Sequence, residues 1–229
     1  MTVADSARAQ LLFLPPPQSA YVFPRDDVRW DLLQRTEHSA ALAGLGSTDL
    51  WTVEAGGKTA ESAAWTIAQP PVEVADMSGY VGFRWNRMDA WYEEDDEVFV
   101  HPRDPYHRVD VLNSSRRVEV RIEGEVVART DRPRLLFETG LPTRYYIPKM
   151  DVRLDLLEPT DTQTRCPYKG VASYWSVRVK DSVRKDLVWG YEAPIPECPK
   201  IENLLCFFNE KVDIHVDGVL QERPHSPWS

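Results

Sequence analysis

The sequence predicts a mainly β protein that is built from two tandem copies of one small domain. Three observations predict this. The chain repeats itself when residue n is aligned with residue n + 124, apolar and polar residues alternate in short runs, and 18 prolines punctuate the chain too often for long helices. Residues 1–91 align with 125–215 without a gap. We therefore expect both copies to build the same core.

The residues that recur in the repeat are the types hardest to replace. A buried tryptophan fills a large volume, and a glycine can adopt backbone angles that other residues avoid. The recurring pairs include Gly46 with Gly170, Trp51 with Trp175, Trp65 with Trp189 and Phe83 with Phe207.

Within the second copy, alternating patterns predict strands and hairpins. Val118–Ile122 alternates and runs into Glu123-Gly124, and a second alternating run ends at Asp217-Gly218, a strong hairpin signal. Residues 174–179 and 187–191 are two further strand candidates. The sequence also predicts two short helices. One starts at Pro148, and the other runs from Ile201 to Phe208, where apolar residues recur at helical spacing.

These patterns divide the chain into four parts. Residues 1–91 are a degenerate first copy, 92–116 a linker, 117–218 the second copy and 219–229 a C-terminal tail. The first copy has no counterpart of 117–124, because those positions would precede Met1. Its opening strand is therefore absent through a late start or is supplied by another segment, since a bare sheet edge invites pairing.

Composition and charge narrow the classes of function. A net charge of -9 disfavours nucleic acid as a partner, because that binding depends on clustered basic residues. No apolar stretch approaches the length of a membrane span, and the start lacks a signal peptide, so we expect a cytoplasmic protein.

The cysteines, Cys166, Cys198 and Cys206, are odd in number, which suits reduced thiols. The sequence has no Cys-x-x-Cys pair and no NAD, flavin or phosphate-loop fingerprint, so we predict neither a structural zinc nor an organic cofactor.

One polar motif separates the two copies. Cys166 and Lys169 align with Leu42 and Leu45 of the first copy, whereas Gly170 is kept as a glycine. The loss of both polar groups from one copy indicates a role separable from folding. A lysine near a thiol favours the reactive thiolate, and a partly buried lysine can itself act as a base or form an imine. The alternative is a buried cysteine beside a surface lysine.

A carboxylate and several aromatic residues are further candidates in the second copy. Glu138 follows an apolar run and aligns with Leu14, so it is either a general acid or base, or an ordinary turn carboxylate that caps backbone amides. Tyr145 recurs as Tyr21, which favours a structural role. With Trp189 and Tyr191 it is nevertheless a candidate for contacting a substrate.

The linker holds the densest cluster of catalytic residue types. His107 could be a general base that Asp104 orients, and His101, Asp104 and His107 could converge on a metal. Arg103 and Arg108 could clamp an anion. The alternative is a salt-bridged loop that joins the two copies.

The motifs Tyr145-x-x-Pro148-x-x-Asp151, Thr164-x-Cys166-Pro167-x-Lys169-Gly170 and Trp189-x-Tyr191-x-x-Pro194 resemble those of domain of unknown function family 427. The resemblance covers 117–218, and the first copy is similar to a degenerate member. It implies a small, mainly β domain with a curved-sheet, Mss4-like or β-tent-like fold, shared with methionine sulfoxide reductases of the B type. It implies little chemistry, because no motif supports the family's nucleotidyltransferase-like label.

We therefore expect a small-molecule enzyme that needs no organic cofactor. Acid–base or nucleophilic chemistry of the lyase, isomerase or hydrolase type would use Lys169, Cys166, Glu138, His107 and Asp104, at a pocket between the second copy and the linker. The alternative is a non-catalytic module that binds or senses an anionic small molecule. A scaffold that forms a homodimer is a third possibility.

Overall fold

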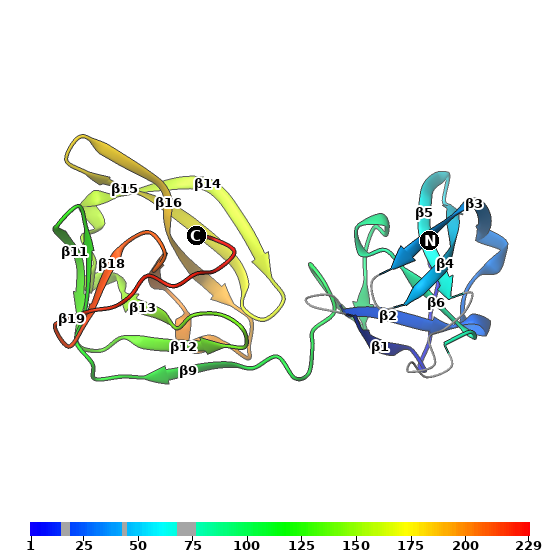
Figure 1. Ribbon diagram of the computed structural model, residues 1–229, viewed down its shortest axis with the longest axis horizontal. Helices are drawn as coiled ribbons and strands as arrows, with labels where there is room; N and C mark the ends of the chain where they lie inside the picture. The colour runs from blue at the N-terminus through cyan, green and yellow to red at the C-terminus, as the bar shows by residue number, and fades with distance from the viewer. Residues whose placement is uncertain (15–18, 43–44, 68–76) are drawn as a thin grey trace. The chain divides into compact units, whose positions relative to one another are not determined.

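A computed structural model describes residues 1–14, 19–42, 45–67 and 77–229. The chain divides into two compact units, Met1–Asp104 and Pro105–Ser229, which we describe separately (Figure 1). Strands dominate both units, and all helices among the described residues are 3-10 turns of three residues. The fold is mainly β, as predicted. Within the described ranges, no helix has the length and apolar character that crossing a membrane requires.

The second unit contains a seven-stranded antiparallel sheet with the order β14-β15-β16-β17-β13-β12-β9. The strands run β9 (Val109–Asn113), β12 (Arg134–Glu138), β13 (Arg144–Pro148), β14 (Leu157–Cys166), β15 (Gly170–Val179), β16 (Ser182–Pro194) and β17 (Leu204–Phe207). The 3-10 turns of this unit are η4 (Lys149–Asp151), η5 (Leu154–Leu156) and η6 (Pro199–Ile201).

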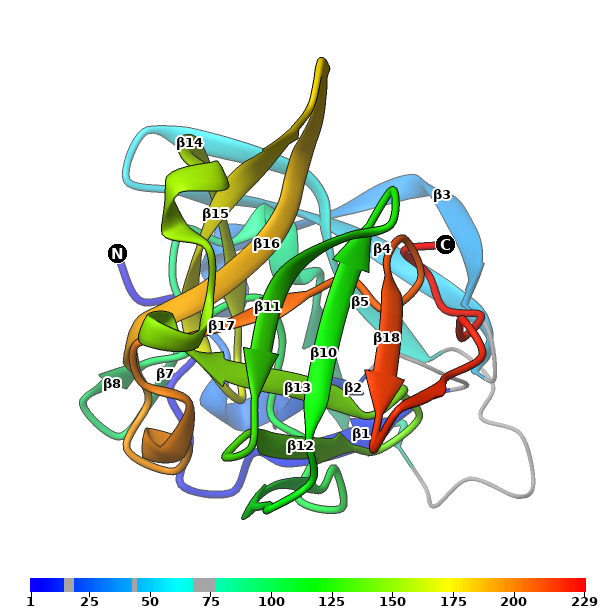
Figure 2. The ribbon, with the colours of Figure 1, turned by 90° about the vertical axis from the view of Figure 1, so that its left-hand side faces the viewer.

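A four-stranded sheet completes the second unit, with β10 (Val118–Ile122), β11 (Glu125–Thr130), β18 (Asp213–Val216) and β19 (Val219–Leu220) in the order β11-β10-β18-β19 (Figure 2). Both predicted hairpins are confirmed. Asp217 and Gly218 have φ angles of 53° and 86°, and positive φ at both central residues matches the twist of an antiparallel hairpin.

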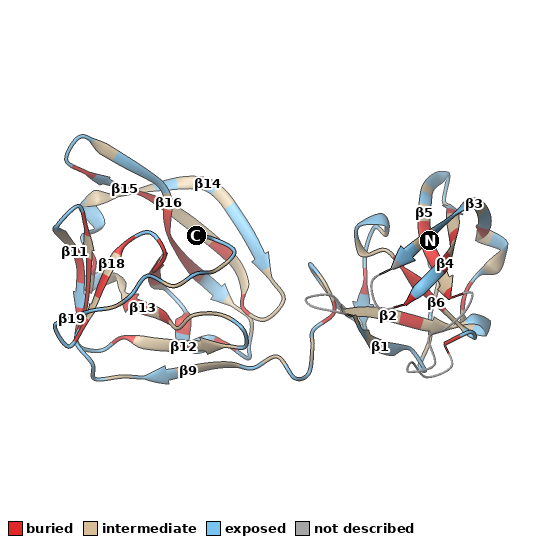
Figure 3. Ribbon diagram, in the orientation of Figure 1, coloured by how far each residue is buried: buried red, intermediate tan, exposed pale blue. Residues whose placement is uncertain are grey.

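The core of the second unit lies between these two sheets. Alternate residues of β10, such as Val118 and Val120, are fully buried and pack with Val177 and Val188 of the larger sheet. Figure 3 shows buried residues along β13, β16 and β18, whereas β14 is exposed or intermediate throughout. Burying each such side chain stabilises the fold by roughly 1.5–3 kcal/mol.

The first unit repeats the larger sheet. Its strands are β1 (Gln10–Phe13), β2 (Ser19–Pro24), β3 (Leu33–Leu42), β4 (Gly46–Ala55), β5 (Lys58–Ile67) and β6 (Tyr80–Phe83), in the order β1-β2-β6-β5-β4-β3. This order equals β12-β13-β17-β16-β15-β14 of the second unit, so the two copies share one strand order, as the repeat predicts. Three 3-10 turns, η1 (Arg25–Asp27), η2 (Trp30–Leu32) and η3 (Trp85–Arg87), and a hairpin of β7 (Tyr92–Glu93) and β8 (Asp96–Glu97) complete this unit.

Tryptophans cover the side of the first unit's core where β10 would lie. Among its described residues, no strand takes that place. Instead Trp85 and Trp91 stack with ring centroids 4.7 Å apart and pack onto Val81 and Phe83. Aromatic side chains bury large apolar areas, so these two rings cover part of the core.

The two helix predictions need correction. Pro148 caps a single 3-10 turn, η4, and no α-helix follows it. The prediction of a helix from Ile201 to Phe208 is wrong, because Leu204–Phe207 forms strand β17, which lies between β13 and β16. Asn203 has a φ of 56°, which ends the preceding turn. A short apolar run fits a buried strand and a helix equally well.

The predicted linker does not form one segment. The boundary between the units falls after Asp104, and residues 109–113 form strand β9 at the edge of the second unit's sheet. In this strand Val109 pairs with Glu138, the last residue of β12. This pairing brings the end of the linker to the candidate site.

Candidate functional site

Strand pairing places His107 against Glu138. Beyond the paired residues Val109 and Glu138, the Thr139 amide donates to the Arg108 carbonyl at 3.0 Å and extends the ladder by one step. The chain therefore holds His107 beside the end of β12, where its Nε2 lies 3.1 Å from Glu138 Oε1.

The hairpin between β14 and β15 brings Lys169 to the same carboxylate. The Lys169 amide donates to the Cys166 carbonyl, and its own carbonyl accepts from Ile195. Gly170 has a φ of +103°, and a Cβ there would lie 3.3 Å from the Ala193 carbonyl oxygen, so the turn requires glycine. Lys169 Nζ donates to both carboxylate oxygens of Glu138 at 2.6 Å.

The three charged or titratable groups are largely withdrawn from water. Only 10% of the Lys169 side chain, 7% of that of Glu138 and 20% of that of His107 is exposed. The His107 ring stacks on Tyr168 with centroids 4.2 Å apart, which fixes the plane of the imidazole. Desolvation of a buried ion pair can exceed its Coulombic gain, so the pair is weak evidence for stabilisation.

The hydrogen bond to Glu138 selects the tautomer of His107. A carboxylate only accepts, so Nε2 carries the proton and Nδ1 presents its lone pair. Nδ1 has no hydrogen bond to any residue within the described ranges. Such an imidazole can accept a proton at Nδ1 while the carboxylate stabilises its charged form.

Apolar burial surrounds this cluster. Cys198 is buried, and burial raises the pKa of its thiol to about 11, against a lowering effect from Lys169 and with smaller raising effects from Cys166 and Glu138. Burial, reinforced by the negative charges of neighbouring groups, also raises the pKa of the Tyr191 hydroxyl. Both residues pack with Leu136, Tyr146 and neighbouring apolar side chains.

The first unit builds the same position from apolar side chains. Leu14 replaces Glu138, and Leu45, which is 1% exposed, replaces Lys169. Leu45 packs with Val22, Trp65 and other apolar residues. The side chain of Leu42, the counterpart of Cys166, lies outside the described residues. The fold therefore accommodates an apolar cluster where the second unit holds a lysine and a glutamate.

Comparison with known families agrees with the two-copy architecture. A sequence model of the family described as a domain of unknown function (DUF427) matches residues 1–94 and 110–218. The chain belongs to this family. The two matched segments correspond to two DUF427 copies in tandem, and Glu138, Cys166 and Lys169 lie within the second. His107 precedes it, so the imidazole comes from outside the matched segments. Comparison with curated proteins found no match.

The other residues predicted for the linker fall on both sides of the unit boundary. His101, Arg103 and Asp104 belong to the first unit. Arg108 is largely exposed and pairs with Asp110. No group of three or more His, Cys, Asp or Glu side chains among the described residues is arranged to hold a metal ion.

The predicted aromatic residues of the second DUF427 copy serve its packing. Trp189 is buried, and its Nε1 donates to the Tyr146 hydroxyl at 3.2 Å. Tyr145 is half-buried and packs against the core between the two sheets rather than the cluster around Tyr191. Sequence reasoning missed Tyr168 as the stacking partner of His107, although Tyr168 stands inside the polar motif. It also missed Cys198 as a neighbour of Lys169, for which the sequence gives no signal.

Thiol labelling should distinguish Cys166 from the other cysteines. Cys166 is partly exposed, whereas Cys198 and Cys206 are buried, and burial raises their pKa values to about 11 and about 12. At pH 8 these two thiols are therefore almost entirely protonated, and only the thiolate reacts. We expect iodoacetamide to label Cys166 first, as read by peptide mass spectrometry. Faster labelling of Cys198 or Cys206 in the native protein would contradict this assignment.

Proposed function

We propose that the second copy, together with His107 of the linker, is an organic-cofactor-independent enzyme that performs acid–base chemistry on a small molecule. The observation that carries the proposal is the buried Lys169–Glu138–His107 cluster, because the first copy builds the same position from leucines. A charged cluster that the fold does not require, and that stabilises it little, points to chemistry.

In this proposal each residue has one role. His107 Nδ1 accepts a proton from the substrate, or from a water that attacks it, and later returns that proton to the product. Glu138 orients the imidazole and stabilises its cationic form through Nε2. Lys169 fixes the position of the Glu138 side chain by donating to both of its oxygens.

The remaining polar group is the thiol of Cys166. It lies at the end of β14, three residues before Lys169, and is the partly exposed cysteine, so it is the candidate nucleophile for a hydrolase-type reaction. Lyase or isomerase chemistry requires only the proton transfer by His107. Imine formation by Lys169 is less favourable, because its ammonium is committed to Glu138.

The same pairing weakens the alternative of an anion-binding module. Lys169 is neutralised by Glu138, and Arg108 is paired with Asp110. The three cysteines are free thiols, which supports the proposal of a reducing, cytoplasmic compartment.

The test is loss of turnover on replacing His107 with Gln. The amide of Gln can still donate to Glu138 but cannot accept a proton, so only the acid–base step is removed. The wild-type chain is incubated with a mixture of small metabolites, and consumed and formed compounds are followed by mass spectrometry. We expect His107→Gln to convert the same compounds at least about 100-fold more slowly, the usual contribution of a general base.

The matched control is His38→Gln, an exposed histidine on β3 of the first copy. This variant should convert substrate at the wild-type rate. Equal turnover by His107→Gln and the wild type, or no turnover of any compound by the wild type, would contradict the proposal.

A further inference from the structure

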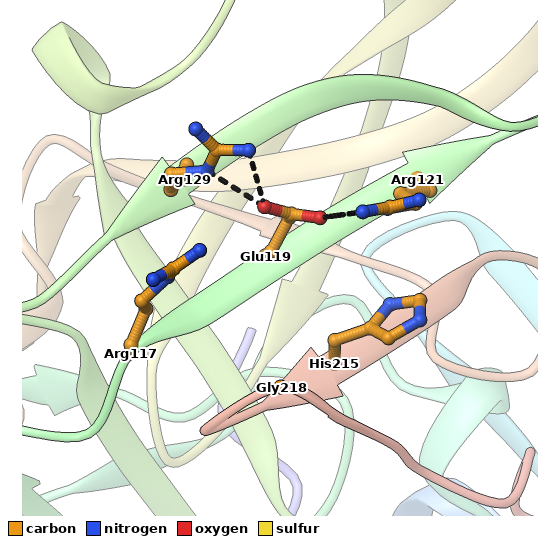
Figure 4. A pocket seen from close by; sticks show the side chains of 6 residues that line it. All are labelled: Arg117, Glu119, Arg121, Arg129, His215 and Gly218. Atoms are coloured by element: carbon orange, nitrogen blue, oxygen red, sulfur yellow. Dashed lines mark hydrogen bonds and ion pairs between the residues drawn. The ribbon is translucent and has the colours of Figure 1, made fainter.

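The outer face of the four-stranded sheet carries a second polar cluster, separate from the acid–base site. It extends across three neighbouring strands, because Glu119 of β10 pairs with Arg129 of β11 on one side and with His215 of β18 on the other. Arg117 and Arg121 stand two residues before and after Glu119, so all five side chains share one face (Figure 4).

Glu119 anchors two of the arginines. Arg121 directs Nε and Nη2 at one carboxylate oxygen, and Arg129 directs the same two atoms at the other, all at 2.6 Å. Only 7% of the Glu119 side chain is exposed, and the hydrogen bond from Arg121, followed by that from Arg129, lowers its pKa despite burial. The carboxylate therefore fixes the position of both guanidinium groups.

The arginines keep donors for a further partner. A guanidinium has five N–H groups, and Glu119 accepts from two nitrogens of each. The side chains of Arg121 and Arg129 remain 41% and 55% exposed. Arg117 is exposed, and its guanidinium pairs with no residue in the described part of the chain. Among the residues that line the hollow, three arginines stand against one carboxylate, which leaves two positive charges in a chain of net charge -9.

An unsatisfied nitrogen gives an independent indication of a ligand. His215 Nδ1 is buried and has no hydrogen-bond partner, and it is the sole side-chain atom of this kind among the described residues. Buried polar atoms are nearly always paired, so such an atom indicates a missing water, ion or ligand. His215 lines the same hollow as the three arginines.

We propose that this hollow binds a phosphate group, either as inorganic phosphate or as the phosphoryl group of a phosphate monoester. The hollow has a volume of about 130 Å³. This is room for one tetrahedral anion. Two net positive charges match a dianion, and arginine forks suit phosphate oxygens.

The first copy offers no such site. Its described residues contain no sheet corresponding to β11-β10-β18-β19, and Trp91 stands where the second copy has His215. The proposal also does not depend on the acid–base function, because no residue is shared between the two clusters.

The test is titration of the full chain with inorganic phosphate by isothermal calorimetry, at low ionic strength and against a chloride blank. We expect saturable binding at one site, with amide shifts in NMR spectra confined to β10, β11 and β18. Arg117→Gln should weaken binding at least about tenfold, which is about 1.4 kcal/mol. Since Arg117 is exposed and its guanidinium has no ion pair with a described residue, this variant should fold normally.

The matched control is Arg178→Gln on β15. The Arg178 side chain is 55% exposed, the same fraction as that of Arg129. This variant removes the same charge elsewhere and should leave binding unchanged. A parallel titration with glycerol phosphate distinguishes the two sources, because tighter binding than inorganic phosphate identifies a monoester as the ligand, whereas equal binding identifies the free ion. Equal weakening in Arg117→Gln and Arg178→Gln would overturn the proposal. So would the absence of saturable binding by the wild type up to about 10 mM phosphate, a Kd that corresponds to a binding free energy of about 3 kcal/mol.

Discussion

Replacing Lys169 with Met is expected to lower the free energy of unfolding of the second unit by about 3–5 kcal/mol, because it breaks a buried ion pair from one side. Lys169 Nζ donates to both oxygens of Glu138, and that side chain is only 7% exposed. Without the lysine, the carboxylate keeps only the hydrogen bond with His107. Met fills a similar volume, so loss of packing contributes little.

Hydrogen exchange measured by mass spectrometry gives this free energy for the second unit through peptides from β12 and β15, and for the first unit through peptides from β4 and β5. Lys58→Met is the matched control, since Lys58 pairs with Asp89 at the surface of the first unit, where both side chains are more than 70% exposed. Such a pair contributes at most about 1 kcal/mol. Equal small effects of Lys169→Met and Lys58→Met would show that the buried pair is not held as described.

The second large effect on the free energy of unfolding is expected at the ion pair of Arg144 with Glu210. Among the ion pairs of the described residues, this one is the most deeply buried. The Arg144 guanidinium donates to both carboxylate oxygens of Glu210 at 2.8 Å, and the two side chains are 6% and 0% exposed. The rings of Trp189 and Trp228 lie within 5.4 Å of the guanidinium. Glu210→Gln leaves an arginine that cannot lose its proton, so we expect a loss of about 3–5 kcal/mol.

The effect of Glu210→Gln should depend on pH. Burial acts to raise the pKa of Glu210, but hydrogen bonds from Arg144 and Ser226 outweigh it and hold the pKa below its usual value. The stabilisation is therefore complete above the unfolded-state pKa and is lost as the pH falls through the folded-state pKa. The free energies of unfolding of the variant and the wild type, measured by chemical denaturation, should therefore converge in acid.

Glu158→Gln is the matched control for Glu210→Gln, because Glu158 pairs with Arg178 while 46% of its side chain is exposed. We expect a change of no more than about 1 kcal/mol there. If the difference in free energy of unfolding between Glu210→Gln and the wild type stays constant from pH 7 to pH 3, the account of this pair is contradicted.

The repeated sheet could be predicted well from the sequence. Its hairpins depend on a few neighbouring residues, and each copy of the repeat supports the pattern found in the other. Glu123-Gly124 and Asp217-Gly218 specify their hairpins through backbone angles that few residues adopt. The offset of 124 residues reproduces even the bridge between Ala4 and Val28, which returns as Ala128 with Val152. The prediction of a helix from Ile201 was wrong. A short apolar run can form a helix or a strand, and here pairing with β13 and β16 makes it a strand.

The candidate site was predicted in part. Lys169 and Glu138 stood out because the first copy replaces both with leucines, a comparison that requires no structure. For His107 the sequence offered Asp104 as the orienting carboxylate, since they are three residues apart, whereas the structure places Glu138 against its Nε2. That contact depends on the pairing of β9 with β12, and a strand of five residues inside a linker gives no clear periodic signal.

The central claim is that the second copy holds the Lys169–Glu138 pair for function, since its fold accepts the apolar residues of the first. The most direct test is the double variant Glu138→Leu/Lys169→Leu, which installs the first copy's residues, compared with both single variants by hydrogen exchange of β12 and β15. We predict that each single variant loses about 3–5 kcal/mol, while the double variant lies within about 1 kcal/mol of the wild type or above it. A double variant that loses as much as the two single variants added together would contradict the claim and make the pair a structural requirement.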